Sequence, residues 1–146
     1  MTINPMTTIL PCACANIRRA SRAVTQFYDG ELRKAGIHAT QFTLLQALTL
    51  AGRISQGHLG DLLAMDSTTL TRTLRILVGK GWVRSLPGAD RRERLLQLTP
   101  AGHRQFDQAR PHWERAQQRL RKSLGDSRWE QAEASLVQMI EAVKRA

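Results

Sequence analysis

The chain of 146 residues is poor in cysteine, in aromatic side chains and in long apolar runs. Its two cysteines, Cys12 and Cys14, are separated by one residue, which fits neither a disulfide framework nor a four-ligand zinc pattern, so we expect reduced thiols. The longest uncharged apolar stretch, residues 42–51, is interrupted by polar side chains and is far shorter than the roughly 20 residues that span a bilayer. The sequence therefore predicts a soluble protein that has no membrane partner.

Motifs of the common enzyme classes are also missing. The sequence contains no G-x-S-x-G, no Walker loop and no G-x-G-x-x-G, so we expect neither catalysis nor a nucleotide cofactor. Four histidines form no close ligand pair, and no metal centre is expected from them: His38, His58, His103 and His112. Residues 1–11 lack the basic start of a secretory signal, so we expect a flexible N-terminal tail there and a cytoplasmic location.

Positive charge, by contrast, is abundant. Lysine and arginine number 22 against 12 acidic residues, which gives a formal net charge of +10, and most of these cations are arginines. The length suits one compact domain. Such an excess on a small domain indicates a partner that carries phosphates, and nucleic acid is the leading candidate, although a high-GC codon bias would produce the same composition.

Apolar periodicity predicts a mainly helical chain with one β-hairpin. Helices are expected over residues 15–35, 40–51, 55–63, 67–79 and 100–124 and from 127 onward. The expected N-caps are Thr40, Ser55, Asp66 or Ser67, Thr99 and Ser127. In the helix over 55–63, Leu59, Leu62 and Leu63 should point inward. Two β-type runs, 82–86 and 94–98, flank a polar turn, so the order is typical of a winged helix-turn-helix.

One face of the helix over residues 67–79 carries hydroxyl and guanidinium groups. At 100° per residue the exposed side holds Thr68, Thr71, Arg72 and Arg75. Arginine can bond guanine O6 and N7 bidentately and threonine can bond bases or phosphates, so this face suits the major groove of DNA. The alternative is a merely solvated basic face. Ile76 either touches a thymine methyl or packs against the preceding helix.

The tip of the hairpin, residues 90–94, adds three arginines. Arginine inserted into a narrow minor groove exploits the strong negative potential there, and we assign this role to Arg92, with Arg91 and Arg94 either as phosphate partners or as substitutes for it. Asp90 is predicted to be an intramolecular brace that orients an arginine and keeps the wing rigid. The alternative is an ordinary turn-favouring aspartate.

These segments together resemble the MarR family of bacterial transcription regulators. The likeness is carried by Leu70-Thr71-Arg72, Gly79-Lys80-Gly81-Trp82-Val83, Asp90-Arg91-Arg92 and Leu96-Gln97-Leu98-Thr99-Pro100-Ala101-Gly102. It implies a single domain over residues 12–146, with a winged helix-turn-helix lobe over 38–99 and dimerisation helices over 12–35 and 100–146. It also implies major-groove contacts from Thr68, Thr69, Arg72 and Arg75, and Ser67 completes the expected contact set. Ile76 departs from the polar residue that many members carry.

The resemblance implies a homodimer that binds a palindromic operator and acts as a repressor. Physical size favours the same conclusion, because a domain of this length has a radius of gyration of roughly 15 Å, whereas recognition helices on successive major grooves lie about 34 Å apart. The expected dimer interface comprises Trp113, Leu120, Trp129, Leu136 and Ile140. Alternatively, these residues form the core of a monomer.

Two kinds of signal could release such a repressor from DNA. The resemblance suggests a small aromatic effector between the dimerisation helices and the DNA-binding lobe, with the candidate lining residues Arg19, Ala23, Phe27, His38 and Phe42. Some members of the family sense oxidants through a cysteine near the start of the first helix, where Cys12 and Cys14 lie. The same pair could chelate a soft metal ion, accept an alkyl group as in a DNA-repair alkyltransferase, or have no sensing role.

Overall fold

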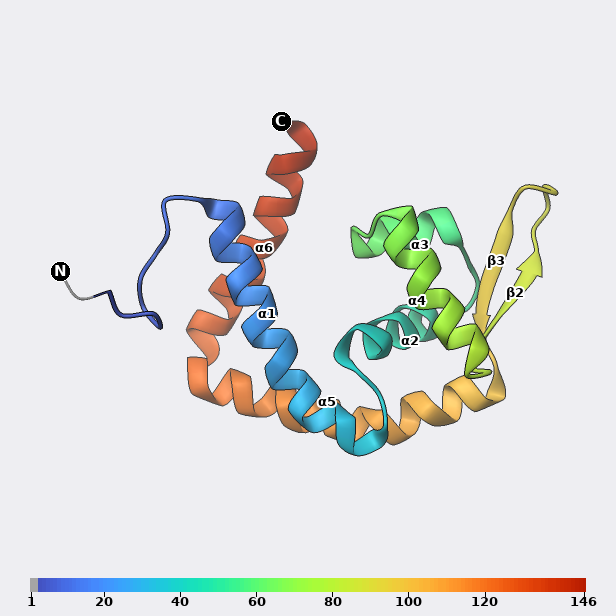
Figure 1. Ribbon diagram of the computed structural model, residues 1–146, viewed down its shortest axis with the longest axis horizontal. Coiled ribbons are helices and arrows are strands. Elements are labelled where there is room, and N and C mark those ends of the chain that lie inside the picture. The colour runs from blue at the N-terminus through green and yellow to red at the C-terminus, as the bar shows by residue number, and fades with distance from the viewer. Residues whose placement is uncertain (1–2) are drawn as a thin grey trace.

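The computed structural model describes residues 3–146, and the first two residues of the expected tail, Met1 and Thr2, lie outside the described residues. In chain order the elements are α1 (Ala13–Leu32), η1 (Arg33–Ala35), α2 (Ala39–Ala51), β1 (Ile54–Ser55), α3 (Gln56–Leu63), α4 (Ser67–Gly79), β2 (Val83–Pro87), β3 (Arg94–Leu98), α5 (Pro100–Leu124) and α6 (Asp126–Arg145). This arrangement confirms the mainly helical winged fold (Figure 1). None of the helices within residues 3–146 is both long and apolar enough to cross a membrane.

The core lies where α2 crosses the first half of α5. Phe42 of α2 is almost fully buried and stacks on Phe106 and Trp113 of α5, with ring centroids 5.3 and 5.9 Å apart. Leu59 of α3 and Leu70 of α4 close the same core from the opposite side. The helix-turn-helix therefore rests on an aromatic stack that belongs partly to the long helix α5.

The turn between α3 and α4 is short, and both helices have well-formed caps. Ser55 accepts the His58 N–H at the start of α3, and Asp66 accepts the Thr69 N–H at the start of α4, which confirms both expected caps. Ala64 closes α3 in the left-handed region. Leu62 is 62% exposed, so its inward placement was wrong. Leu59 and Leu63, four residues apart, supply the narrow inward stripe, and Leu62 falls beyond its edge.

The sheet has three antiparallel strands in the order β1-β3-β2. The expected hairpin is confirmed, with Val83 opposite Leu98 and Pro87 opposite Arg94. Strand β1 was not predicted, because two residues carry no measurable alternation. Its pairing of Ile54 with Leu96 attaches the wing directly to the segment that begins α3.

Three helix starts differ from the expected ones. Helix α1 begins at Ala13, two residues early. Helix α2 begins after His38 instead of Thr40, because the Gln41 side chain accepts the His38 N–H and Asp29 of α1 accepts the Ala39 N–H at 2.7 Å. Helix α6 begins after Gly125, so Ser127 is not its N-cap. Tertiary contacts and the preceding turn decided these ends instead of the local capping pattern.

The start of α5 is packed tightly against the start of β2. Thr99 accepts the Gly102 N–H as the expected N-cap, and its hydroxyl donates to the carbonyl of Gly81. The Thr99 N–H donates to the carbonyl of Trp82. A Cβ atom at Gly102 would lie 2.0 Å from that same Trp82 oxygen. The wing is therefore fixed to α5 at a point where only glycine fits.

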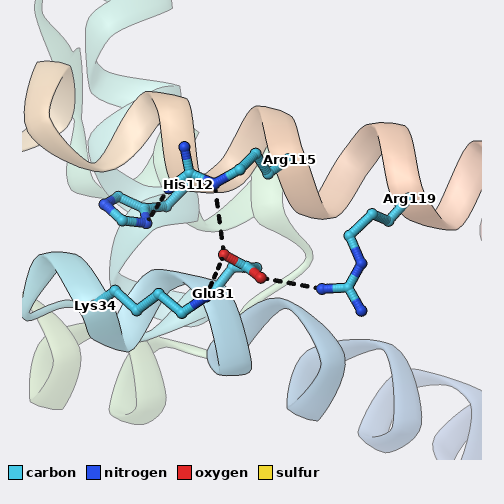
Figure 2. A network of polar contacts seen from close by, with 5 residues as sticks. All are labelled: Glu31, Lys34, His112, Arg115 and Arg119. Carbon is cyan, nitrogen blue, oxygen red and sulfur yellow. Dashed lines mark hydrogen bonds and ion pairs between the residues drawn. The ribbon is translucent and has the colours of Figure 1, made fainter.

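A buried carboxylate joins α1 to α5. Glu31 is 8% exposed and accepts from Lys34 Nζ at 2.9 Å and from Arg119 Nη1 at 3.0 Å, while Arg115 Nε lies 3.6 Å away (Figure 2). The hydrogen bond from Lys34 and the three positive charges hold the pKa of Glu31 below its ordinary value, although burial acts in the opposite direction. His112 accepts from Arg115. The cluster fixes the angle between the two helices.

Helix α6 packs on α5 and otherwise projects from the molecule (Figure 1). Every side chain of α6 except Trp129 is exposed. The exposed apolar side chains on it are Leu136, Val137, Met139, Ile140 and Val143. The described part of the expected tail folds back on α1, where Arg19 donates to the carbonyls of Thr8 and Pro5 and Asn16 donates to that of Leu10.

Candidate nucleic-acid interface

The exposed face of α4 is a polar hollow. Leu70, Leu74 and Leu77 anchor the opposite face in the core. With that face of α4 buried, the exposed face has a hollow of about 330 Å³ that is lined by Ser67, Thr68, Thr71, Arg72 and Arg75. Those five belong to the expected contact set, and all are exposed. The hollow thus offers hydroxyl groups and two guanidinium groups and contains no acidic side chain in its lining.

Thr69, also in the expected set, has a structural role at the start of α4. Its hydroxyl donates to Asp66 Oδ2 at 2.6 Å, while its N–H donates to Oδ1 at 2.9 Å. Both bonds hold the pKa of Asp66 below its ordinary value, and the bond from the Thr69 hydroxyl has the larger effect. The Thr69 hydroxyl proton is therefore used inside the protein.

Gln56, which the sequence reasoning missed, contacts the polar face of α4. Its Nε2 donates to Thr71 Oγ1 at 2.9 Å, across 15 residues of sequence. Gln56 is the first residue of α3, and it lines a hollow of about 600 Å³ between α3 and the wing that Arg92 and Arg94 also line. No local pattern in the sequence could have found this contact.

The tip of the wing is held by main-chain bonds. Asp90 accepts the Arg92 N–H through its side chain and the Glu93 N–H through its carbonyl. Within residues 3–146, no ion pair joins Asp90 to an arginine, so its brace acts on the turn and not on a guanidinium. Arg91 and Arg92 are exposed at the tip, whereas Arg94 Nε donates to Ser85 across the hairpin.

The wing tip and the N-terminal part of α4 both point away from α5 (Figure 1). Because β1 links the wing to the start of α3, both basic elements belong to one packed lobe. The lobe can therefore present a basic helix and a basic hairpin to one extended polyanion.

Away from the basic elements, a cavity of about 250 Å³ lies between α1, α2 and α5. Its lining residues are Val24, Thr25, Tyr28, Leu32, Ala39, Phe42, Thr43 and Trp113. Burial and the charge of Glu133 raise the pKa of Tyr28, whose hydroxyl donates to Gln117. The cavity is a partly aromatic space where the terminal helices meet the winged lobe.

Of the five candidate pocket residues, Phe42 lines this cavity and the other four lie elsewhere. Arg19 and Ala23 line a surface hollow beside the N-terminal segment, Phe27 lies under the Arg119 guanidinium, and His38 is exposed at the start of α2. From α1, residues 24, 28 and 32, which are spaced four apart, line the cavity together with residue 25.

The cysteines and four of the five expected interface residues lie away from the core, at the start of α1, on α6 and on the second half of α5. Cys12 and Cys14 are exposed free thiols at the start of α1. The described residues contain no group of three His, Cys, Asp or Glu side chains that could hold a metal ion. Leu136 and Ile140 are 55% and 52% exposed, and Leu120 and Trp129 are half-buried. Trp113 packs into the core of its own chain.

Residues 37–93, which include α2, α3, α4, strand β2 and the turn that follows it, match the model of the MarR family. Among curated proteins, the multiple antibiotic resistance protein MarR of Salmonella typhimurium is 43% identical over 67 residues, which span 45% of this chain and 46% of that protein. An uncharacterised HTH-type transcriptional regulator of Bacillus subtilis, YwoH, is 27% identical over 63% of this chain and 67% of that protein. The longer of these matches thus leaves a third of its relative uncovered.

Solved structures match over almost the whole chain. The M. tuberculosis transcriptional regulator MosR in complex with DNA is 36% identical with a TM-score of 0.79, over 90% of this chain and 98% of that one. A cysteine-to-serine mutant of MarR from E. coli complexed with operator DNA is 28% identical with a TM-score of 0.80, over 94% and 99% of the two chains. The likeness therefore includes the terminal helices as well as the winged lobe.

Proposed function

The chain belongs to the MarR family of DNA-binding transcriptional regulators, and from this premise we propose that it is a homodimeric repressor that binds a palindromic operator sequence-specifically. Helix α4 enters the major groove of duplex DNA, and the wing lies along the neighbouring minor groove. The observation that carries the proposal is the hollow on α4, where exposed hydroxyl groups accompany Arg72 and Arg75.

The polar face of α4 is suited to reading bases. Arg72 and Arg75 can each bond a guanine edge, and Thr68 can bond a base or a phosphate. The wing is suited to a different task, because Arg91 and Arg92 lie exposed on a turn whose main chain is fixed by Asp90. A rigid basic tip gains electrostatic attraction in a narrow minor groove without needing base-specific bonds. Two solved relatives bound to DNA support this assignment of the lobe.

Helix α6 supports the homodimer. Its apolar side chains are about half exposed or more, and a helix that keeps such a surface in water gains little stability from packing. Residues 136, 140 and 143 recur at helical spacing, so they form one stripe that a second copy of α6 can cover. Two copies of the chain also supply two recognition helices, which a palindromic site requires.

The test is selection of bound duplexes from random DNA, followed by affinity measurements on the selected sequence and on random DNA. Arg72→Ala should weaken binding to the selected duplex by about 1–3 kcal/mol and relax its base preference. Arg92→Ala should weaken binding to both kinds of DNA to a similar extent. Equal losses on both kinds of DNA for Arg72→Ala would contradict the groove assignment, and failure of the wild-type protein to enrich any sequence would contradict the proposed function.

For release from DNA we propose a small aromatic ligand in the cavity between α1, α2 and α5. Phe42, Trp113 and Tyr28 supply aromatic surfaces, and about 250 Å³ accommodates one substituted ring. A ligand there touches both the lobe and the terminal helices, so it can favour one relative orientation of the two. Titration of the protein–DNA complex with a panel of phenolic compounds tests this, and a Thr43→Trp variant that fills the cavity should lose any response.

Oxidation of the thiols is a second candidate for release. Both Cys12 and Cys14 are exposed, so an oxidant and a second thiol can reach them. Peroxide would accept two electrons and two protons from a pair of thiols, one from each subunit, to give one disulfide and two waters. Mass spectrometry and DNA binding after mild peroxide treatment test this. An unmodified protein, or a Cys12→Ser/Cys14→Ser variant that still loses DNA after treatment, would exclude the mechanism.

A further inference from the structure

From the contact between α3 and α4 we propose that Gln56 is a specificity-determining residue, because its bond to Oγ1 favours the Thr71 hydroxyl as a hydrogen-bond donor toward DNA. The inference rests on the proposed function and deepens it. Its basis is one bond, from Gln56 Nε2 to Thr71 Oγ1 at 2.9 Å, at the margin of the hollow that Arg72 and Arg75 line.

The Thr71 hydroxyl differs from that of other helical threonines in this chain. Thr43, Thr49 and Thr73 each donate their hydroxyl proton to the carbonyl four residues earlier, at 2.8–3.0 Å. Within the part of the chain that the structure describes, Thr71 makes no such bond, and its oxygen accepts from Gln56 instead. Its proton therefore has no partner inside the protein and is available to a ligand in the hollow.

The direction of this bond matters because a threonine hydroxyl can both donate and accept a hydrogen bond. A free hydroxyl can donate to an acceptor or accept from an amino group, so it discriminates poorly among bases. Gln56 occupies one of the two lone pairs of Oγ1, and the hydroxyl proton is left without a partner in the described part of the protein, so an acceptor on DNA is the favoured partner. In the major groove guanine offers O6 and N7, thymine O4 and adenine N7, whereas cytosine offers its amino group as a donor. Thr71 should therefore discriminate against cytosine.

The fold holds Gln56 in place for this role. Ser55 caps α3 directly before Gln56, and strand β1 fixes Ser55 opposite Leu95 of the wing. Gln56 itself is half-buried between α3 and α4, where it lines a hollow with Leu70. Its amide therefore comes from a backbone that two neighbouring elements restrain, which keeps the bond to Thr71 in register with the groove face.

The experiment compares base preferences of the full-length protein by selection from a duplex library randomised across the binding site. The variants are Gln56→Glu, Gln56→Ala, Thr71→Val and the double variant Gln56→Glu/Thr71→Val. The carboxylate that Gln56→Glu introduces can only accept, so the Thr71 hydroxyl should donate its hydrogen bond to it and turn its oxygen lone pairs toward DNA. His58→Glu, on the same helix, is the control for the added negative charge, which weakens binding to all sequences alike.

The wild-type protein should deplete cytosine at one position of each half-site. Gln56→Glu should relieve this depletion by about two- to tenfold, the range expected for a single hydrogen bond, and His58→Glu should leave it in place. Gln56→Ala should give an intermediate preference. In the Thr71→Val background the Gln56→Glu change should have no further effect on preference, because the hydroxyl that transmits it is gone.

Two results would overturn the inference while leaving the proposed function intact. One is a wild-type base preference in both Gln56 variants, and the other is an unchanged preference in Thr71→Val. If the wild-type protein enriches no sequence, the proposed function fails and this inference fails with it. A change in overall affinity alone, with base preference unchanged, would show that Gln56 has only a structural role and would also contradict the inference.

Discussion

Replacement of Gly102 by alanine should destabilise the protein although it improves the intrinsic helix propensity of α5. The new Cβ would lie 2.0 Å from the Trp82 carbonyl oxygen, 2.9 Å from its carbon and 3.2 Å from its Cα. All three are backbone atoms, so a rotamer change cannot relieve the overlap. Relief requires α5 to move away from β2, and the Trp82 oxygen already accepts the Thr99 N–H.

The change in the free energy of unfolding is the sum of two destabilising contributions and one stabilising contribution. Overpacking against a fixed neighbour costs about 1–3 kcal/mol. Weakening of the bond between Thr99 and Trp82 adds about 0.5–1.5 kcal/mol. The gain in helix propensity offsets at most about 1 kcal/mol. The net loss therefore lies between about 0.5 and 4.5 kcal/mol, and its midpoint of about 2.5 kcal/mol corresponds to a fall in melting temperature of roughly 5–10 °C for a domain of this size.

The assay is thermal unfolding followed by circular dichroism at one fixed protein concentration, since a dimer's stability depends on concentration. Gly30→Ala is the matched control, because Gly30 lies inside α1 and a Cβ there has open space. It should raise the melting temperature by up to a few degrees. A Gly102→Ala protein that melts at or above the wild-type temperature would refute the reasoning from close approach.

Two further changes test other parts of the structure. Glu31→Gln should lower the melting temperature at pH 7. Because the pKa of Glu31 is depressed in the folded protein, its carboxylate stabilises the fold above the ordinary value of 4.5, and this stabilisation is lost as the pH falls and the group is protonated. The difference in melting temperature should therefore shrink below pH 4.5, and a difference of equal size at pH 7 and pH 3 would contradict this. Ile140→Asp should weaken self-association at least about tenfold by placing an unpaired charge in the proposed dimer interface, as measured by sedimentation. Gln138→Asp, about 200° around α6, is its control, and equal losses would argue against the stripe.

The sequence predicted the winged helix-turn-helix lobe well because its helices and strands follow local sequence rules. Asp66 and Ser55 are strong N-caps, leucines at helical spacing define the buried face of α4, and alternation with a Pro-Gly turn defines the hairpin. Once the buried face is known, the exposed arginines follow from the period of the helix. These parts of the interface could therefore be placed without a structure.

The remaining features depend on contacts that no local pattern encodes. Gln56 meets Thr71 across a turn, and Glu31 meets Arg119 across 88 positions. Strand β1 is two residues long, too short to carry a period. The lining of the aromatic cavity combines residues of α1, α2 and α5 that lie far apart in the sequence, so no local period identifies it.

The pairing of Ile54 with Leu96 limits how a signal can act on this protein. Strand β1 runs directly into α3, and Thr99 at the start of α5 donates to the carbonyls of Gly81 and Trp82 at the base of the hairpin, so we expect the wing, α3 and the start of α5 to move together. In the proposed dimer, a ligand bound elsewhere would change the distance between the two lobes and would leave the spacing between helix and wing within each lobe unchanged. Loss of DNA would then come from a mismatch with the half-site separation, with each half-site still fitting its own lobe.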